Sequence, residues 1–150
     1  MLTRINKIIV FDFNRTLHDP DSDSLVPNVR LVLDELKNKG HTLPLLSRRE
    51  GGRDAPVDSL GTRDYFSKAY FVDQKSVDNF KVILSEYDAR ASSGFVVGDY
   101  VPDEIAFGNK IGTTTIWARR GKFSDLTPAL PHEHPNYTVR NLRDILEIID

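Results

Sequence analysis

The 150-residue sequence contains no cysteine, which excludes disulfide bonds, thiolate metal sites and a cysteine nucleophile. The lack of disulfides is in keeping with a cytoplasmic protein, and we expect that location. No stretch approaches the roughly 18 consecutive apolar residues of a membrane-spanning helix. The first residues, MLTRINK, lack the apolar run of a signal peptide. A net charge of −2 provides no general attraction to nucleic acid or to membranes.

The remaining composition is that of an ordinary globular protein. Apolar residues make up 39% of the chain and charged residues 28%. A chain of this length can bury a substantial core, so we expect one domain over residues 1–150.

The most informative stretch is KIIVFDFNRTL at residues 7–17. The apolar run over residues 8–13 predicts a strand that is buried on both faces. Asp12 lies where this run ends, and Asn14, Arg15 and Thr16 follow directly. Ligands bind beyond the carboxyl ends of strands in open parallel sheets. Taken alone, the stretch is explained better by an aspartate that bonds the amides of a turn.

Helices alternate with strands along the rest of the chain, which predicts a parallel sheet covered on both faces. Right-handed crossovers would place the carboxyl ends of all strands at one edge. We expect strands at 8–13, 42–46, 69–72, 94–97, 113–118 and 137–139, and helices at 26–39, 77–87, 102–110 and 142–149. We expect the segment 18–24 to be a polar turn, 55–60 a weak helix and 64–66 a helical turn.

Four polar residues follow predicted strands: Asp12, Ser47, Lys75 and Asp99. Two carboxylates from adjacent strands, together with a backbone carbonyl, would form an all-oxygen site suited to Mg²⁺. Ser47 and Lys75 would hold a phosphate, and Asp103 would be a ligand or a partner of a ligand. Each of these residues alone is better explained as a helix cap, a turn residue or a solvated charge.

In this order, the segments resemble the motifs of the haloacid dehalogenase-like superfamily of phosphohydrolases. Residues 12–17 are similar to its first motif, Asp-x-Asp-x-Thr. Ser47 and Lys75 match its second and third motifs, and 98–103 matches Gly-Asp-x-x-x-Asp, its fourth. The resemblance implies a three-layer Rossmann-like α/β fold with a mainly parallel central sheet.

The resemblance also implies a mechanism. Asp12 would attack phosphorus and form an aspartyl-phosphate, which water then hydrolyses. Ser47 and Lys75 would hold the phosphoryl group. Asp12, Asp99 and the backbone carbonyl of Asn14 would hold Mg²⁺, with Asp103 behind them.

Two residues depart from the family pattern. Asn14 occupies the position of a second aspartate, which in relatives protonates the leaving group and later activates water. An asparagine does neither, and losing such acid–base help costs about 10²–10⁴-fold in rate. Arg15 stands where glycine is common, and its guanidinium would hold an anion or point to solvent. Thr16 would bond locally or, with Arg15, help to hold the phosphate.

The short gaps between the motifs leave no room for a cap domain. Capless relatives act on macromolecules or close their sites by forming oligomers, and this chain fits either description. Two loops carry groups of basic residues: Arg48, Arg49 and Arg53 in one, and Arg119, Arg120 and Lys122 in the other. These residues would form a positive collar around the site or lie on ordinary solvated loops. The His132-Glu133-His134 run, between two prolines, is interpreted as a surface loop rather than a metal site.

We therefore expect a Mg²⁺-dependent phosphoric monoester hydrolase that acts on a phosphorylated small molecule or macromolecule. The alternative is a catalytically degenerate relative that binds a phosphorylated ligand or partner without turnover. A true dehalogenase is a weaker alternative, because such enzymes need a capped apolar pocket and no metal.

Overall fold

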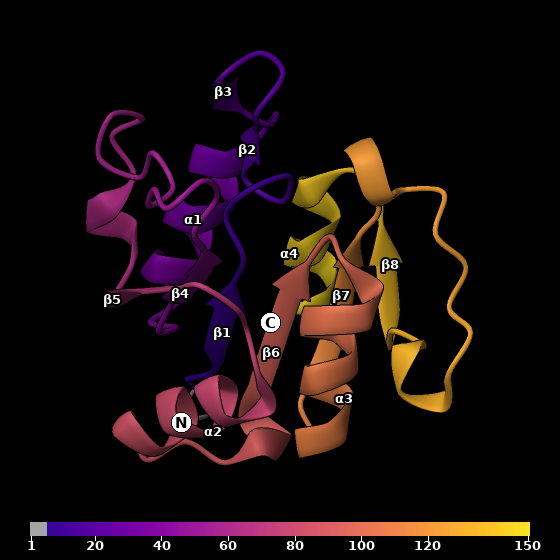
Figure 1. Cartoon of the computed structure of the whole chain (residues 1–150). Coiled ribbons are helices and arrows are strands. Elements are labelled where there is room, and N and C mark those ends of the chain that lie inside the picture. The colour runs from indigo at the N-terminus through magenta and orange to yellow at the C-terminus, as the bar shows by residue number, and fades with distance from the viewer. Residues whose placement is uncertain (1–5) are drawn as a thin grey trace.

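The computed structural model describes residues 6–150 (Figure 1). The expectation that the first residues form no signal peptide falls largely outside this range. Within residues 6–150 the strands form a six-stranded sheet in the order β5-β4-β1-β6-β7-β8, and all neighbours are parallel. The strands are β1 (Ile8–Phe11), β4 (Pro44–Arg48), β5 (Lys68–Val72), β6 (Gly94–Gly98), β7 (Thr114–Ala118) and β8 (Tyr137–Val139).

Helices cover both faces of this sheet. The helices are α1 (Val29–Asn38), α2 (Val77–Glu86), α3 (Ala106–Ile111) and α4 (Ile145–Ile148). The buried residues of α1 and α4 belong to one apolar cluster, and those of α2, with α3 packed against them, belong to another. The predicted three-layer Rossmann-like α/β fold with a mainly parallel sheet is therefore confirmed.

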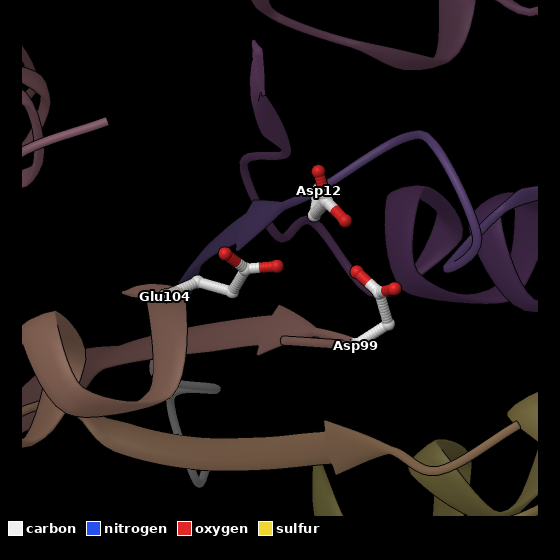
Figure 2. Close-up of side chains that lie close together, drawn as sticks. All are labelled: Asp12, Asp99 and Glu104. Carbon is white, nitrogen blue, oxygen red and sulfur yellow. The ribbon is translucent and has the colours of Figure 1, made fainter. Parts of the chain in front are cut away.

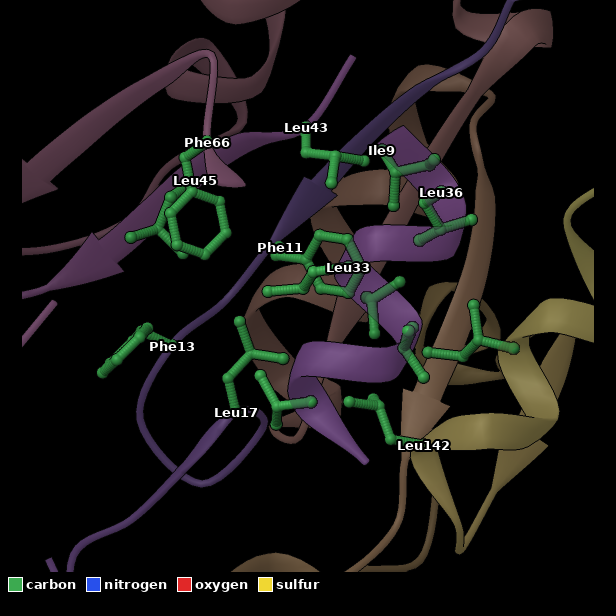
Figure 3. Packing of buried hydrophobic residues seen from close by; sticks show 14 of the residues in the cluster. Ile9, Phe11, Phe13, Leu17, Leu33, Leu36, Leu43, Leu45, Phe66 and Leu142 are labelled. Carbon is green, nitrogen blue, oxygen red and sulfur yellow. The ribbon is translucent and has the colours of Figure 1, made fainter. Parts of the chain in front are cut away.

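Strand β1 lies at the centre because its side chains are apolar on both faces. Ile9 and Phe11 point into the larger cluster beside α1, as Figure 3 shows, whereas Ile8 and Val10 point into the opposite cluster. All four side chains are buried. Burying side chains of this size stabilises a fold by about 1.5–3 kcal/mol each, so this strand is a rigid base for the residues that follow it.

The helix expected at 26–39 begins three residues later than predicted. Pro27 disfavours a helical conformation at Val26, and Asn28 is left-handed with φ 71°, so α1 starts at Val29. Helix α2, in contrast, agrees with prediction at its start. Ser76 accepts a hydrogen bond from the backbone of Asn79, whose side chain bonds the backbone of Ser76 in return.

One local prediction is wrong and two are incomplete. Segment 55–60 forms successive turns rather than a helix, because it is too short and proline-interrupted to propagate one. The predicted polar turn at 18–24 contains an antiparallel hairpin, β2 (His18–Asp19) with β3 (Ser24–Leu25), whose two-residue strands are too short to show a pattern. The helix expected at 102–110 begins as a π-helical turn, Val101–Ile105, before α3.

The intervals between the motif-bearing strands hold no inserted domain in the described chain. Between β1 and β4 lie only the β2–β3 hairpin and α1, and between β4 and β5 only loops and a 3₁₀ turn, Arg63–Tyr65. The expectation of a core without a cap agrees with this arrangement. No helix among residues 6–150 is long and apolar enough to cross a membrane.

Candidate active site

The predicted site residues meet at the carboxyl edge of the sheet. Asp12 directly follows β1 and Asp99 follows β6, and these two strands are hydrogen-bonded neighbours. The backbone N–H of Asp12 donates to Val97 at 3.0 Å, and the indole of Trp117 donates to the carbonyl of Asp99 at 3.0 Å. Both aspartates are therefore held by the sheet itself.

A third carboxylate, from the π-helical turn, completes an acidic cluster. One carboxylate oxygen each from Asp12, Asp99 and Glu104 lies within 4.8 Å of the others, and all three side chains are buried. Figure 2 shows these carboxyl groups pointing toward one another. No other group of His, Cys, Asp or Glu side chains in residues 6–150 has this metal-site geometry.

Lys75 is the counter-ion of this cluster. Its Nζ donates to Oδ1 of Asp12 at 2.7 Å and lies 3.6 Å from Oε2 of Glu104. The hydroxyl of Thr16 donates to Oδ2 of Asp12 at 3.0 Å, which confirms the expected local bond. Burial opposes ionisation of Asp12, but the Lys75 charge and hydrogen bonds from Asp99, Lys75 and Thr16 outweigh burial and hold the pKa of Asp12 below its usual value.

The other two carboxyl groups resist ionisation. Burial, reinforced by the charge of Asp12, raises the pKa of Asp99 to about 10. Burial also raises the pKa of Glu104 to about 7, against the opposing charge of Lys75. Three buried carboxyl groups thus face one ammonium, and a bound divalent cation would supply the missing positive charge.

Two buried polar atoms have no hydrogen-bond partner, and each fits a missing ligand. Oδ2 of Asp99 is buried and unpaired, as expected of a metal-facing carboxylate oxygen. Oγ of Ser47 is also buried and has no hydrogen-bond partner. Ser47 is the second-last residue of β4, so it lies within the strand rather than after it as predicted. The all-oxygen donor set fits Mg²⁺, and the free hydroxyl and Lys75 fit a phosphate oxygen.

Glu104 was not among the predicted site residues, and Asp103 was. Asp103 is only partly buried, which raises its pKa, and it lines the cavity outside the carboxylate cluster. Glu104 packs over Gly98, where an added Cβ would overlap the Cγ of Glu104. The sequence feature that could have indicated Glu104 is Gly98, at the end of a predicted strand. A glycine there leaves room for a side chain from the following helix.

Asn14 is held by a residue that the sequence did not single out. Its Oδ1 lies 3.1 Å from Nδ1 of His18, whose Nε2 lies 2.9 Å from Oδ1 of Asp23. His18 is buried and stacks on Phe13, with ring centroids 5.7 Å apart. Asn14 also lines the cavity.

Arg15 lies at the mouth of the site. Its backbone is left-handed, with φ 66°, where glycine is usual in the family motif. Its guanidinium forms an ion pair with Glu50 at 2.9 Å and lies over the ring of Phe123, 5.5 Å from the centroid. The phosphate-binding roles of Arg15 and Thr16 stay predictions.

A cavity of about 390 Å³ is lined by the carboxylate cluster, Lys75, Asn14 and Arg15, whereas Ser47 and Thr16 do not line it. Arg48, Arg49 and Lys122 line it, so part of the predicted basic collar is present. Arg49 is paired with Asp54 at 2.8 Å and Asp73 at 3.3 Å, whereas Arg48 and Lys122 have no carboxylate partner in the described chain. The other three predicted basic residues, Arg53, Arg119 and Arg120, do not line this cavity.

The His132-Glu133-His134 run lies away from this cavity, in a surface loop as interpreted. Both histidines are exposed. Nδ2 of Asn109 donates to the backbone carbonyls of His132 and His134, at 2.7 and 2.8 Å, which fixes the loop without a metal ion.

Comparisons with known proteins agree with the motifs. A family model described as HAD-hydrolase-like matches residues 77–145. A glyceraldehyde 3-phosphate phosphatase of Pyrococcus furiosus is 23% identical over 131 residues, which are 83% of this chain and 54% of that protein. The chain spans about half the length of the curated relatives it matches.

Solved structures show the same fold. The 2-haloacid dehalogenase of Pseudomonas syringae pv. Tomato DC3000 aligns with a TM-score of 0.75 at 18% identity, over 96% of this chain and 98% of that chain. A HAD phosphatase of Thermococcus onnurineus aligns with a TM-score of 0.74 at 13% identity, over 95% and 97%. The resemblance of this chain to the haloacid dehalogenase-like superfamily is therefore confirmed, in sequence over residues 77–145 and in fold over nearly the whole chain.

Proposed function

We propose that this chain is a Mg²⁺-dependent phosphatase in which Asp12 is the nucleophile. The observation that carries the proposal is the environment of Asp12. This buried carboxylate is kept ionised by Lys75 and belongs to a cluster of three buried carboxyl groups that could hold a metal ion. Relatives named as phosphatases support the same reaction class.

Mg²⁺ would be held by Asp12, Asp99 and the backbone carbonyl of Asn14. Glu104 and Asp103 would orient these ligands and balance charge around them. When bound, the ion would neutralise phosphate oxygens and hold the phosphoryl group in line with the nucleophile. The unpaired Oδ2 of Asp99 and the single counter-ion of the cluster support this assignment.

In the reaction, an oxygen of Asp12 forms a bond to phosphorus while the bond from phosphorus to the ester oxygen breaks. Ser47 and Lys75 hold the oxygens of the transferred group. Water then attacks the phosphorus of the aspartyl-phosphate and releases phosphate and Asp12. Asn14 neither donates nor accepts a proton in these steps, so esters with weakly basic leaving groups are the favoured substrates.

The open mouth of the cavity fits a phosphorylated small molecule or a phosphorylated macromolecule. Arg48 and Lys122, which lack carboxylate partners among residues 6–150, would attract its negative charge. Nucleic acid and membranes are not expected partners. A homo-oligomer that closes the mouth and a cytoplasmic location both stay predictions.

The proposal is tested by trapping the phosphorylated enzyme. The natural protein and Asp12→Asn are incubated with an activated aryl phosphate and Mg²⁺, quenched in acid, and weighed by mass spectrometry. We expect one added phosphate on the natural protein, removed by hydroxylamine as an acyl phosphate would be, and none on Asp12→Asn.

Asp34→Asn, a change of an exposed carboxylate on α1, is the matched control and should behave as the natural protein does. A phosphate adduct of equal yield on Asp12→Asn would contradict the assignment of the nucleophile. Phosphate release by Asp12→Asn at the natural rate would contradict it equally.

A further inference from the structure

His18 is a buried histidine whose two ring nitrogens both contact oxygen atoms. It is 5% exposed, although it begins the short β2–β3 hairpin at the edge of the fold. Nδ1 lies 3.1 Å from Oδ1 of Asn14, and Nε2 lies 2.9 Å from Oδ1 of Asp23. The nucleophile mechanism described above does not use this histidine.

The chemistry of the contact with Asn14 fixes the direction of that hydrogen bond. A side-chain carbonyl oxygen and a carboxylate oxygen only accept hydrogen bonds. His18 therefore donates from Nδ1 to Oδ1 of Asn14, while Nε2 lies beside the carboxylate of Asp23. The contact of Nε2 with Asp23 holds the other side of the ring.

The amide nitrogen of Asn14 is consequently left free. Oδ1 is engaged by His18, and Nδ2 has no partner in the described part of the chain. Asn14 lines the same cavity as Asp12 and Lys75. A carboxamide anchored through its oxygen presents its N–H groups to whatever occupies that cavity.

We propose that His18, held by Asp23, is a positioning residue that turns the carboxamide of Asn14 so that its N–H donates to the bound phosphoryl group. This inference rests on the proposed phosphatase function and deepens it. A fixed donor stabilises negative charge on the phosphoryl oxygens without transferring a proton. Asn14 then replaces a proton donor with a neutral hydrogen-bond donor.

The backbone around the first motif supports this role. The N–H of Arg15 donates to the carbonyl of His18, and the N–H of His18 donates to the carbonyl of Phe13 at 3.0 Å. The ring of His18 stacks on that of Phe13. The tight loop and the stack together hold the imidazole beside Asn14.

The kinetic test is a double-mutant cycle between His18→Phe and Asn14→Ala. Phenylalanine keeps the ring that stacks on Phe13 but removes both ring nitrogens. With an activated aryl phosphate and Mg²⁺, we expect His18→Phe to lower kcat about 10-fold with little change in KM, since one oriented hydrogen bond is lost. In the Asn14→Ala background, the same change should have no further effect.

A loss of equal size in both backgrounds would overturn the proposal, because His18 would then act without Asn14. No loss in the natural background would also overturn it. Asp23→Asn should reproduce part of the His18→Phe effect, whereas Asp21→Asn, an exposed carboxylate on the same hairpin, should not. Equal effects of these two variants would indicate a purely structural role for the hairpin.

A second readout does not depend on turnover. In ¹⁵N-labelled protein, the side-chain amide signals of Asn14 should shift in His18→Phe while those of Asn79 and Asn109 stay unchanged. Unchanged Asn14 signals would overturn the proposal. If the natural protein hydrolyses no phosphate ester, the proposed function fails, and this measurement still decides whether His18 positions Asn14.

Discussion

Nζ of Lys75 lies 2.7 Å from Oδ1 of Asp12, and the two side chains are only 4% and 8% exposed. A buried ion pair of this kind adds little net stability, because both charges lose their hydration. Its consequence is chemical, since the adjacent ammonium keeps Asp12 ionised in surroundings that protonate Asp99 and Glu104. An ionised carboxylate is what a nucleophile requires.

Replacing Lys75 by methionine should therefore destabilise the protein in a pH-dependent way. The pKa of Asp12 is now held below its usual value, so its ion pair contributes stability above that value and loses it in acid. Without the ammonium, burial would raise the pKa of Asp12 above its usual value. Asp12 would then lower the stability of the protein as pH rises, instead of contributing to it. We expect a loss of about 3–5 kcal/mol at pH 8 and a clearly smaller one at pH 4, measured by urea denaturation.

Lys68→Met is the matched control for this comparison. Lys68 forms an exposed ion pair with Glu86 at 3.3 Å, and exposed pairs contribute little. A Lys75→Met loss that is the same at both pH values, or no larger than that of Lys68→Met, would contradict the role given to the buried pair.

Asp99→Asn should separate stability from metal binding. Burial disfavours the charged form of Asp99, so the amide removes an unfavourable group from the metal-free protein. We expect Asp99→Asn to raise Tm without Mg²⁺ and to abolish the further rise in Tm that Mg²⁺ gives the natural protein. If thermal melts of Asp99→Asn still respond fully to Mg²⁺, Asp99 is not a ligand; Asp34→Asn should respond as the natural protein does.

The affinity for Mg²⁺ should increase between pH 6 and pH 8. Binding requires ionised carboxylates, and the pKa of Glu104 is raised to about 7 and that of Asp99 to about 10. Folding raises both pKa values. The stability of the metal-free protein should therefore decrease as pH rises above the usual pKa of a carboxyl group, and the decrease should continue between pH 6 and pH 8. Titration calorimetry and denaturation at several pH values measure the two trends, and a pH-independent affinity would argue against the cluster as the metal site.

Much of the fold follows from local patterns in the sequence, and the failures are local too. Strand β1 and helix α2 are predictable because β1 is continuously apolar and Ser76 with Asn79 forms a recognisable cap. The β2–β3 hairpin is not predictable, because strands of two residues show no alternation. The start of α1 depends on the left-handed conformation of Asn28, which the sequence permits but does not require.

Some residues of the candidate site can likewise be predicted from the sequence, and others cannot. Asp12, Ser47, Lys75 and Asp99 are recognisable because each is at or near the end of a strand in an ordered set of motifs. Glu104 and Asp103 are adjacent in sequence, and only the π-helical turn decides which of them points inward. The contact of His18 with Asn14 depends on the geometry of one tight loop, which has no sequence pattern of its own.

Gly98→Ala should disrupt the site through Glu104. A Cβ at residue 98 would overlap the Glu104 side chain, which is buried and cannot move aside without leaving the cluster. We expect a loss of about 1–3 kcal/mol in stability together with weaker Mg²⁺ binding. Gly94→Ala, in the same strand, meets its nearest atom at 3.2 Å and should cost less and leave Mg²⁺ binding unchanged, so equal effects of the two substitutions would contradict this explanation.

The most direct test of the central claim is hydrolysis of an activated aryl phosphate with and without Mg²⁺, using the natural protein, Asp12→Asn and Asn14→Asp. We predict Mg²⁺-dependent turnover by the natural protein, none by Asp12→Asn, and faster turnover by Asn14→Asp because a proton donor is restored. Turnover by Asn14→Asp alone would indicate a natural chain that binds phosphorylated ligands without hydrolysing them. Equal turnover by the natural protein and Asp12→Asn would contradict the account of Asp12 as the nucleophile.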